Sequence, residues 1–457
     1  MNLPRDRTVA VWRRTIRLSW PVAAEQLFNT LMRTTDIIIT ALFSPAAVAA
    51  IGLADLYAQL SLRFGSGLGG GAIALSSQDT GRGAAADRDE AITQALAIGG
   101  LLGVPIVLFG LFFSRPAIAV LGADPETVDL GSVYLAIILV SAPLRIVGLI
   151  GTRALQGTGD TRTPMYVNVT SYTVNIAGSV ALGLGVLGPR LGIVGVGVGT
   201  AAGNAVTAGG VLLALASPRI EAGLARPRQT TITRQLVVVS VPRAAEGLVT
   251  TLVYFPFNAL LLSFGTSVNA GYQIGRRLYT QLGGPLYRAY NTTASIIVGQ
   301  ALGEERPEAA KFDGYAHAAF ALLTLTVSGV ALFFGAGWFV RLFADDAATI
   351  THAVGFARSF AVSMLFIGLF FSFSGALQGA GETRVPFLAR LTGLVAFFLG
   401  FSYVASVVLD FGVAGTYVGI VLFYAWLAIV VTGSFVRGRW AARAAELIEA
   451  RDDGVTG

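Results

Sequence analysis

The sequence predicts an all-α, polytopic membrane protein with twelve transmembrane helices arranged in two six-helix lobes. Three observations predict this fold: an apolar composition, long apolar stretches along the chain, and an internal duplication. Of the 457 residues, 54% are hydrophobic and 13% are charged, and the mean hydropathy is +0.69. A soluble protein carries about a quarter charged residues because it must solvate its whole surface. Most of this chain is therefore expected to lie in lipid.

The chain starts with an arginine-rich arm, Met1 to Trp20, which lacks the short apolar core and cleavage site of a signal peptide. Twelve apolar stretches follow, each long enough to cross about 30 Å of hydrocarbon. They lie at residues 17–43, 51–76, 92–113, 131–152, 164–184, 192–216, 236–264, 272–298, 315–337, 355–378, 387–409 and 412–436. Most basic residues then fall in segments predicted to be cytoplasmic, as the positive-inside rule requires. We expect a multi-pass protein of the cell membrane with both termini in the cytoplasm.

The second half of the chain repeats the first at an offset of about 221 residues, which indicates a duplication. The matching segments are Ser19–Leu27 with Ser240–Leu248, Gln78 and Gly81 with Gln300 and Gly303, and Ala154–Pro164 with Ala376–Pro386. In the last of these, Asp160 and Arg162 are expected to cap helix ends or to pair across the loop, and direct cargo contact is the alternative. Six helices per repeat give two lobes of the same orientation. The predicted divisions are residues 1–216 for the N-terminal lobe, 217–235 for a cytoplasmic linker, and 236–457 for the C-terminal lobe.

Four polar residues form a stripe along one face of the first predicted helix, because they are spaced by four, four and three residues. They are Glu25, Asn29, Arg33 and Asp36. The corresponding residues of the second half are Glu246, Thr250, Tyr254 and Phe257. Asp36 thus has no acidic counterpart, which favours ion coupling over a structural role shared by both repeats. Pro21 precedes the stripe, and it either allows the helix to bend or only starts its first turn.

The duplicated plan, the pattern from Pro21 to Asp36, and the paired Leu-Gln-Gly-x-Gly-[Asp/Glu]-Thr-Arg-x-Pro loops resemble the MATE (multidrug and toxic compound extrusion) family of transporters. The resemblance runs from about Arg13 to Arg437. It implies a V-shaped, two-lobed helical fold that exports small organic compounds in exchange for Na⁺ or H⁺.

The resemblance also implies that Asp36 carries the coupling cation. Asn175 matches an asparagine of the family's cation site, and Thr200 matches its threonine. Ser179 stands where the family has a second aspartate, so the site would hold Na⁺ less tightly. No cofactor is expected beyond the coupling ion, and no metal beyond a possible Na⁺ at Asp36. Arg33, one turn from Asp36, either pairs with it and favours the ionised carboxylate, or faces a cavity and leaves it free.

Arginines outnumber acids within the predicted spans, so anionic or zwitterionic cargo is one prediction. The alternative is that these arginines pair with acids and carbonyls, or extend to the interface. The candidate residues for a cargo cavity are Arg63, Tyr134, Tyr254, Phe257, Arg277 and Arg288.

Several functional classes are excluded by missing motifs. The only lysine is Lys311, so no P-loop is present, and neither His-Glu-x-x-His nor Gly-x-Ser-x-Gly occurs. The basic residues form no single patch for nucleic acid. Together with the family resemblance, these absences predict a monomeric, cation-coupled antiporter that works by alternating access and is not an enzyme. Two alternatives remain: a lipid-linked oligosaccharide flippase or organic-anion exporter, and a non-transporting receptor or scaffold, which would need extramembrane domains larger than these loops.

Overall fold

A computed structural model describes the backbone of residues 5–186 and 188–456, and the side chains of these residues except 60 and 453–456. It is helical throughout, without a strand in the described part of the chain. The helices are α1 (Arg5–Ala41), α2 (Pro45–Gly81), α3 (Ala85–Ala119), α4 (Pro125–Val140), α5 (Ala142–Gly157), α6 (Arg162–Gly178), η1 (Ser179–Gly183), α7 (Ile193–Leu215), α8 (Thr230–Ser263), α9 (Thr266–Gly303), α10 (Pro307–Val340), α11 (Ala347–Gly379), α12 (Arg384–Gly393), η2 (Leu394–Phe401), η3 (Val404–Val408), α13 (Val413–Arg437) and α14 (Arg439–Thr456).

Each of the twelve predicted spans falls on helical backbone, although several run one or two residues past a helix end and the span 131–152 contains the break at Ser141 between α4 and α5. Among the described residues, eight helices are long and apolar enough to cross a membrane, and the bent pair α4–α5 makes a ninth. The three other spans lie in α1, α6 and α9, which carry Asp36, Asn175 and Arg276. These helices do not meet the same criterion of length and apolar composition, because they carry polar residues. Helix α6 is also short, with 17 residues. The chain has the all-α fold of a polytopic membrane protein.

The two halves repeat their local structure. Asp160 accepts hydrogen bonds from the backbone amides of Arg162 (3.1 Å) and Thr163 (3.0 Å) at the start of α6. Glu382 does the same for Arg384 (3.0 Å) and Val385 (3.3 Å) at the start of α12. The expected capping role of Asp160 is therefore confirmed, in both repeats. A π-helical segment ends each of these spans, η1 after α6 and η2–η3 after α12.

The chain forms two compact units that do not follow the repeat boundary. Unit 1 consists of residues up to Ala23 together with Ala245–Ala450, and unit 2 of Ala24–Ala244 together with the chain from Arg451. The predicted boundaries at residues 216 and 235 follow the sequence repeat, whereas the two units are defined by which residues contact one another in the structure. Three helices, α1, α8 and α14, consequently begin in one unit and end in the other.

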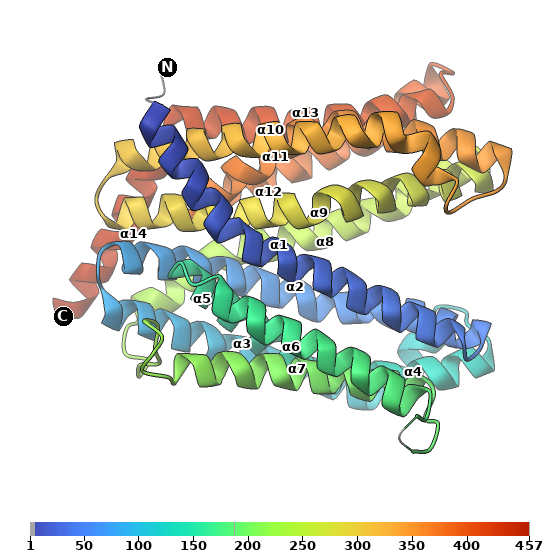
Figure 1. Ribbon diagram of the computed structural model, residues 1–457, viewed down its shortest axis with the longest axis horizontal. Helices are drawn as coiled ribbons and strands as arrows, with labels where there is room; N and C mark the ends of the chain where they lie inside the picture. The colour runs from blue at the N-terminus through green and yellow to red at the C-terminus, as the bar shows by residue number, and fades with distance from the viewer. Residues whose placement is uncertain (1–4, 187, 457) are drawn as a thin grey trace. The chain divides into compact units, whose positions relative to one another are not determined.

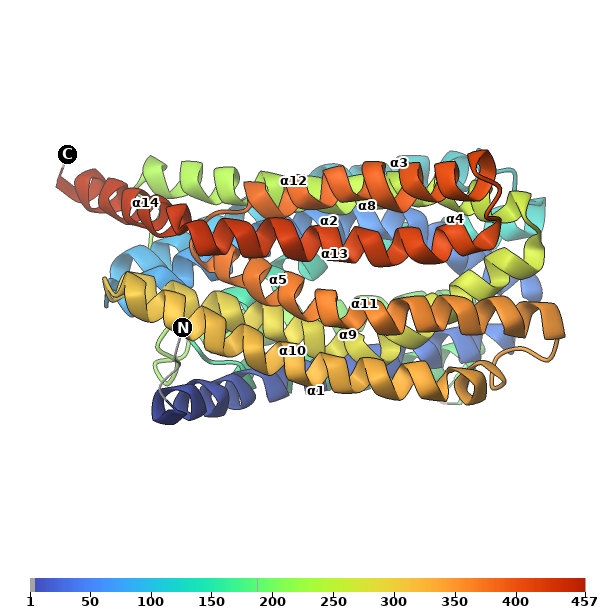
Figure 2. The same ribbon diagram turned by 90° about the horizontal axis from the view of Figure 1, so that it is seen from above.

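Each unit has its own core. In unit 1, α9, α10 and α11 pack against one another, and α12 lies beside α13 (Figure 2). This core is rich in aromatic side chains, including Phe257, Tyr272 and Phe398. In unit 2, α2 packs on α3, α4 and α5, and α6 lies beside α7 (Figure 1).

The predicted linker is ordered on the surface of unit 2. The part of the predicted linker from Thr230 onward already belongs to α8, so the linker is non-helical only up to Gln229. Acidic residues at the start of α3 hold it: the backbone amides of Arg228 and Gln229 each donate to Oε1 of Glu90 at 2.5 Å. The amide of Gly223 donates to Asp89 at 2.9 Å.

Candidate functional site

The four residues predicted to hold the coupling cation lie together in unit 2. Ser179 donates from its Oγ to Oδ1 of Asp36 at 2.9 Å and lies 3.5 Å from Oδ1 of Asn175. Asn175 donates from Nδ2 to Oγ1 of Thr200 at 3.1 Å. Asp36 comes from α1, Asn175 and Ser179 from α6 and η1, and Thr200 from α7. Three segments of the chain thus bring one carboxylate, one amide and two hydroxyls into a continuous hydrogen-bonded group.

Close packing of α6 on α7 makes this group possible. A Cβ added to Gly199 would lie 2.8 Å from the backbone nitrogen of Ser179 and 3.0 Å from the carbonyl oxygen of Asn175. Glycine at 199 therefore lets the backbone of α7 approach η1, and the next residue, Thr200, reaches Asn175. Asn175 and Ser179 are both buried, at 2% and 0% exposed.

Two charged residues of this site were missed by the sequence reasoning. Asp55 of α2 is half-buried and interacts through charge with Arg33 and Arg145. Arg145 of α5 donates to the carbonyl oxygen of Ala58 at 3.4 Å. Both lie inside predicted spans, so the rule that intramembrane charges mark functional sites would have found them. In the described part of the chain, no three His, Asp or Glu side chains group as metal ligands.

Arg33 does not form the predicted hydrogen-bonded pair with Asp36. Its charge acts on both Asp36 and Asp55, but Asp36 has its side-chain hydrogen bond with Ser179. The Arg33 residue is largely exposed. Among the described residues, no hydrogen bond or ion pair therefore joins the Arg33 guanidinium to the Asp36 carboxylate, and the alternative in which Arg33 faces a cavity stays a prediction.

The polar stripe continues below Asp36 along α1. The side chain of Asn29 lies beside that of Tyr172 of α6. Glu25 is 7% exposed, and Nε2 of Gln156 lies 3.5 Å from its Oε2. In unit 1 the repeat counterpart of Glu25, Glu246, forms an ion pair with Arg390 at 2.5 Å. Glu246 is therefore paired directly with a guanidinium, whereas Glu25 lies beside an amide and interacts with Arg153 through charge.

Pro21 lies inside α1, which begins sixteen residues earlier at Arg5. The alternative that Pro21 only starts the first turn is therefore wrong, because the arginine-rich arm is itself helical. Proline leaves the carbonyl four residues earlier, on Arg17, without its usual intrahelical partner. The chain passes from unit 1 to unit 2 after Ala23, two residues beyond Pro21. It returns to unit 1 after Ala244, two residues beyond Pro242.

The six candidate cargo residues are divided between the two units. Arg63 and Tyr134 belong to unit 2, and the other four belong to unit 1. Phe257 is 0% exposed, with its ring centroid 4.0 Å from that of Phe398, so it packs the core and lines no cavity in this conformation. Tyr134 is also buried, at 6% exposed, in an apolar cluster of unit 2.

Arg276, which was not among the candidates, lies at the tyrosines of unit 1 in place of Arg277. Its guanidinium is 5.5 Å from the ring centroid of Tyr254 and 5.9 Å from that of Tyr272. Arg277 and Arg288 are both exposed, and Arg277 lies 5.7 Å from the ring of Phe343. Sequence position alone gave no signal for which of the two adjacent arginines faces the aromatic cluster.

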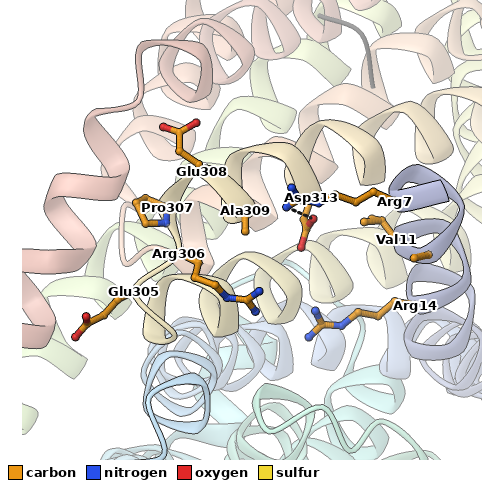
Figure 3. Close-up of a pocket in the computed structure, with 10 residues that line it drawn as sticks. Arg7, Val11, Arg14, Glu305, Arg306, Pro307, Glu308, Ala309 and Asp313 are labelled. Atoms are coloured by element: carbon orange, nitrogen blue, oxygen red, sulfur yellow. Dashed lines mark hydrogen bonds and ion pairs between the residues drawn. The ribbon is translucent and has the colours of Figure 1, made fainter. Parts of the chain in front are cut away.

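A pocket of about 700 Å³ opens in unit 1 between the first turns of α1 and the start of α10 (Figure 3). Arg7 and Asp313 point toward one another at its wall, with 3.4 Å between Nη2 and Oδ1. Arg14 projects into the same space and donates to Gln300 at 2.6 Å. None of the predicted coupling or cargo residues lines this pocket.

The comparisons with known proteins agree with this architecture. The chain matches the family model MatE over residues 21–180 and 242–404. It is 27% identical over 435 residues to a probable multidrug resistance protein NorM of Bradyrhizobium diazoefficiens, covering 92% of this chain and 91% of that protein. A probable NorM of Rhodopseudomonas palustris is 25% identical over 433 residues, covering 90% and 89%.

A solved structure with the same fold is the outward-facing conformation of a multidrug resistance MATE family transporter of the MOP superfamily. The TM-score is 0.85 at 22% identity, covering 95% of this chain and 96% of that one. Both matched segments of the family model begin at the prolines of the repeat, Pro21 and Pro242.

Proposed function

The chain belongs to the MatE family of multidrug efflux transporters, and from this premise we propose that it exports small organic molecules from the cytoplasm in exchange for H⁺ or Na⁺. The observation that carries the proposal is the hydrogen-bonded group of Asp36, Ser179, Asn175 and Thr200. A carboxylate at membrane depth is costly unless its charge is used or compensated. Here it faces hydroxyl and amide groups that suit a bound cation.

Asp36 is the cation-binding group in this proposal. When a proton binds, the carboxyl becomes neutral, and Ser179 can accept a hydrogen bond instead of donating one. When Na⁺ binds, the oxygens of Asp36, Asn175, Ser179 and Thr200 are available as ligands. Either event neutralises the charge of Asp36, which interacts with Arg33.

The binding of the cation must alter a conformational equilibrium to drive export. Helices α1 and α8 support such a coupling, because each leaves one unit and enters the other directly after a proline. Asp36 lies on the unit 2 portion of α1. A change in the charge of Asp36 therefore acts on a helix that also belongs to unit 1, and we propose alternating access through these two helices.

Organic anions are a second candidate for the cargo, favoured by the arginines within the spans. Arg276 lies over two tyrosine rings in unit 1, and Arg33 and Arg145 lie near the cation site in unit 2. A guanidinium beside aromatic faces suits a planar, negatively charged molecule.

A proteoliposome assay tests both parts of the proposal. The protein is reconstituted with an imposed proton or sodium gradient, and uptake of a cationic dye and of an anionic dye is measured. Movement of either dye under one gradient, absent in Asp36→Asn, supports coupled export and identifies the ion. Movement under neither gradient contradicts it and favours a lipid-linked oligosaccharide flippase.

A further inference from the structure

The pocket of unit 1 presents more positive than negative charge to its interior. Its lining residues come from the first turns of α1 and from the turn between α9 and α10, and all of them belong to unit 1. Arg14 and Arg306 project toward one another across the space (Figure 3). Glu305 and Glu308 line the same pocket but point away from it. Among the lining residues, Asp313 is therefore the acid that faces both arginines.

The protein itself compensates these guanidinium groups incompletely. Asp313 already pairs with Arg7 at 3.4 Å. Arg14 donates to the uncharged side chain of Gln300 at 2.6 Å, and no carboxylate of the described residues forms an ion pair with it. Burial lowers the pKa of the Arg14 guanidinium; the charge of Asp313 raises it, and that of Arg306 lowers it again. An anion bound between Arg14 and Arg306 would offset their repulsion.

Arg306 is free to exchange its present partner for such an anion. It forms an ion pair with Glu304, but its side chain is 61% exposed and that of Glu304 is 37% exposed. Exposed ion pairs contribute little to stability, because water competes for both charges. Arginine forms paired, charge-assisted hydrogen bonds with phosphate oxygens. A phosphate group is therefore a suitable anion for this pocket.

The pocket lies at the end of the membrane-spanning region. The predicted spans begin at residue 17 in α1 and at residue 315 in α10, and the predicted span in α9 ends at residue 298. The lining residues lie at 7–14 and 305–313, directly outside these three spans. The pocket is therefore expected at the depth of the lipid headgroups, where basic pockets between membrane helices bind anionic lipids.

The other side of α1 is apolar and exposed at the same level. Val9, Ile16 and Trp20 are 42%, 50% and 44% exposed, and their spacings of seven and four place them on one face. Tryptophan is enriched where membrane helices meet the interface. Arg17, which is also exposed, lies on the helix surface between this apolar stripe and the side that carries Arg14. Acyl chains along the stripe would thus bring their headgroup to the pocket.

We propose that this pocket binds the phosphate group of an anionic phospholipid, with Arg14 and Arg306 as its ligands and the acyl chains along the apolar stripe of α1. Free phosphate shares the chemistry that the arginines recognise, but the stripe and the position at the end of the spans favour the lipid. A zwitterionic headgroup is disfavoured, because its ammonium group would approach Arg17. Binding at this pocket requires neither the coupling ion nor the cargo.

A lipid titration tests the site directly. Purified full-length protein, stripped of lipid in a neutral detergent, is titrated with phosphatidylglycerol, and native mass spectrometry measures the occupancy of the first bound lipid. Phosphatidylcholine with the same acyl chains is titrated in parallel, and inorganic phosphate is added as a competitor. We expect phosphatidylglycerol to bind at least about tenfold more tightly than phosphatidylcholine, and excess inorganic phosphate should not displace it.

Arg14→Gln and Arg306→Gln should each lower the affinity for phosphatidylglycerol about tenfold, because each removes a charge-assisted hydrogen bond to the phosphate. Arg14→Lys keeps the charge but loses the forked geometry and should be intermediate. Arg306 is exposed, so its variant tests the site even if Arg14→Gln does not fold. Arg5→Gln removes the same charge from an exposed arginine of α1 outside the pocket, and it should change the affinity by less than about twofold at physiological salt.

Asp313→Asn should raise the affinity about fivefold, since it removes the negative charge that faces the phosphate. If the pair of Asp313 with Arg7 only held the pocket in shape, the same variant would lower the affinity instead.

Unchanged affinity in both Arg14→Gln and Arg306→Gln, or an equal loss in Arg5→Gln, would overturn the site. Displacement of phosphatidylglycerol by inorganic phosphate would overturn the lipid as its occupant. None of these measurements involves transport, so their failure is distinguishable from a failure of the proposed export.

Discussion

Ser179 donates a hydrogen bond of 2.9 Å from its Oγ to Oδ1 of Asp36. The two residues are far apart in the chain, and the contact joins the first helix of the protein to the π-helical turn η1 that follows α6. It places a carboxylate beside a hydroxyl that either donates or accepts, and beside the amide of Asn175. This contact is the starting point for two predictions about coupling.

Asp36→Asn should abolish gradient-driven export while leaving the folded protein in the membrane. The amide keeps the size of the side chain but does not take up a proton or offer a charge to Na⁺. Dye movement in proteoliposomes measures the effect, and the melting temperature in detergent monitors folding. The matched control is Asp129→Asn, because Asp129 forms a surface ion pair with Arg115 at 2.6 Å and is 60% exposed. Full export by Asp36→Asn would exclude Asp36 as the coupling group.

Ser179→Asp should increase the dependence of export on Na⁺. The substitution adds a second carboxylate within hydrogen-bond distance of Asp36, and two adjacent carboxylates attract a metal cation more strongly than one. Ser179→Ala should instead weaken the site without adding charge. Transport at a series of sodium concentrations and fixed pH measures the apparent sodium affinity of both variants. An unchanged sodium response in Ser179→Asp would place the coupling cation elsewhere.

The sequence predicted this group from a resemblance and from helical spacing, but it did not predict the surrounding charges. Asp36 stood out because its repeat counterpart is Phe257, whereas Asp55 was passed over although Arg63 of the same predicted span was considered. The partners of Asp55 come from α1 and α5, Arg33 and Arg145. Contacts between helices depend on their rotation and depth, which local periodicity does not specify.

The division into units was also beyond the sequence patterns. The repeat predicted a boundary near the linker, and helix α1 was expected to belong entirely to the first lobe. Instead, its arginine-rich start packs in unit 1, where Thr15 hydrogen-bonds the buried His317 at 3.1 Å. Arg451 of α14 had no local signal either, because it donates to Gln78 and Gln235, which are hundreds of residues away in the chain.

Pro21→Ala should slow export while preserving or raising stability. Alanine restores the intrahelical bond to the carbonyl of Arg17 and favours a straight helix. We expect kcat to fall with little change in KM, since Pro21 lies away from the residues of the cation site. Comparison of initial rates over a range of cargo concentrations separates the two constants. The equivalent substitution Pro242→Ala in α8 tests whether both prolines share this role, and an unchanged kcat in each variant would remove them from the conformational mechanism.

Arg390→Met should destabilise unit 1 by about 3 kcal/mol, because it removes the ion-pair partner of the buried acid Glu246. The double variant Arg390→Met, Glu246→Gln should recover much of this loss, since it removes both charges of the pair. Chemical or thermal unfolding in detergent measures the two free energies. A double variant as unstable as the single one would show that Arg390 contributes mainly by packing, for example against Phe370, whose ring centroid is 4.9 Å away.

Glu90→Ala should release the linker from unit 2 and expose it to trypsin. Glu90 accepts the backbone amides of Arg228 and Gln229 at 2.5 Å and Nε2 of Gln94 at 2.8 Å. Hydrogen bonds to a charged acceptor contribute about 1.5 to 3 kcal/mol each, so their loss should raise local opening by at least about tenfold. Trypsin cleaves after arginine, and Arg226 and Arg228 lie in this segment. Limited proteolysis followed by mass spectrometry of the fragments measures the change. Glu308→Ala, at an exposed glutamate of α10, should leave the linker as resistant as in the wild type. Equal cleavage of all three proteins would show that Asp89 and Thr93 hold the linker without Glu90.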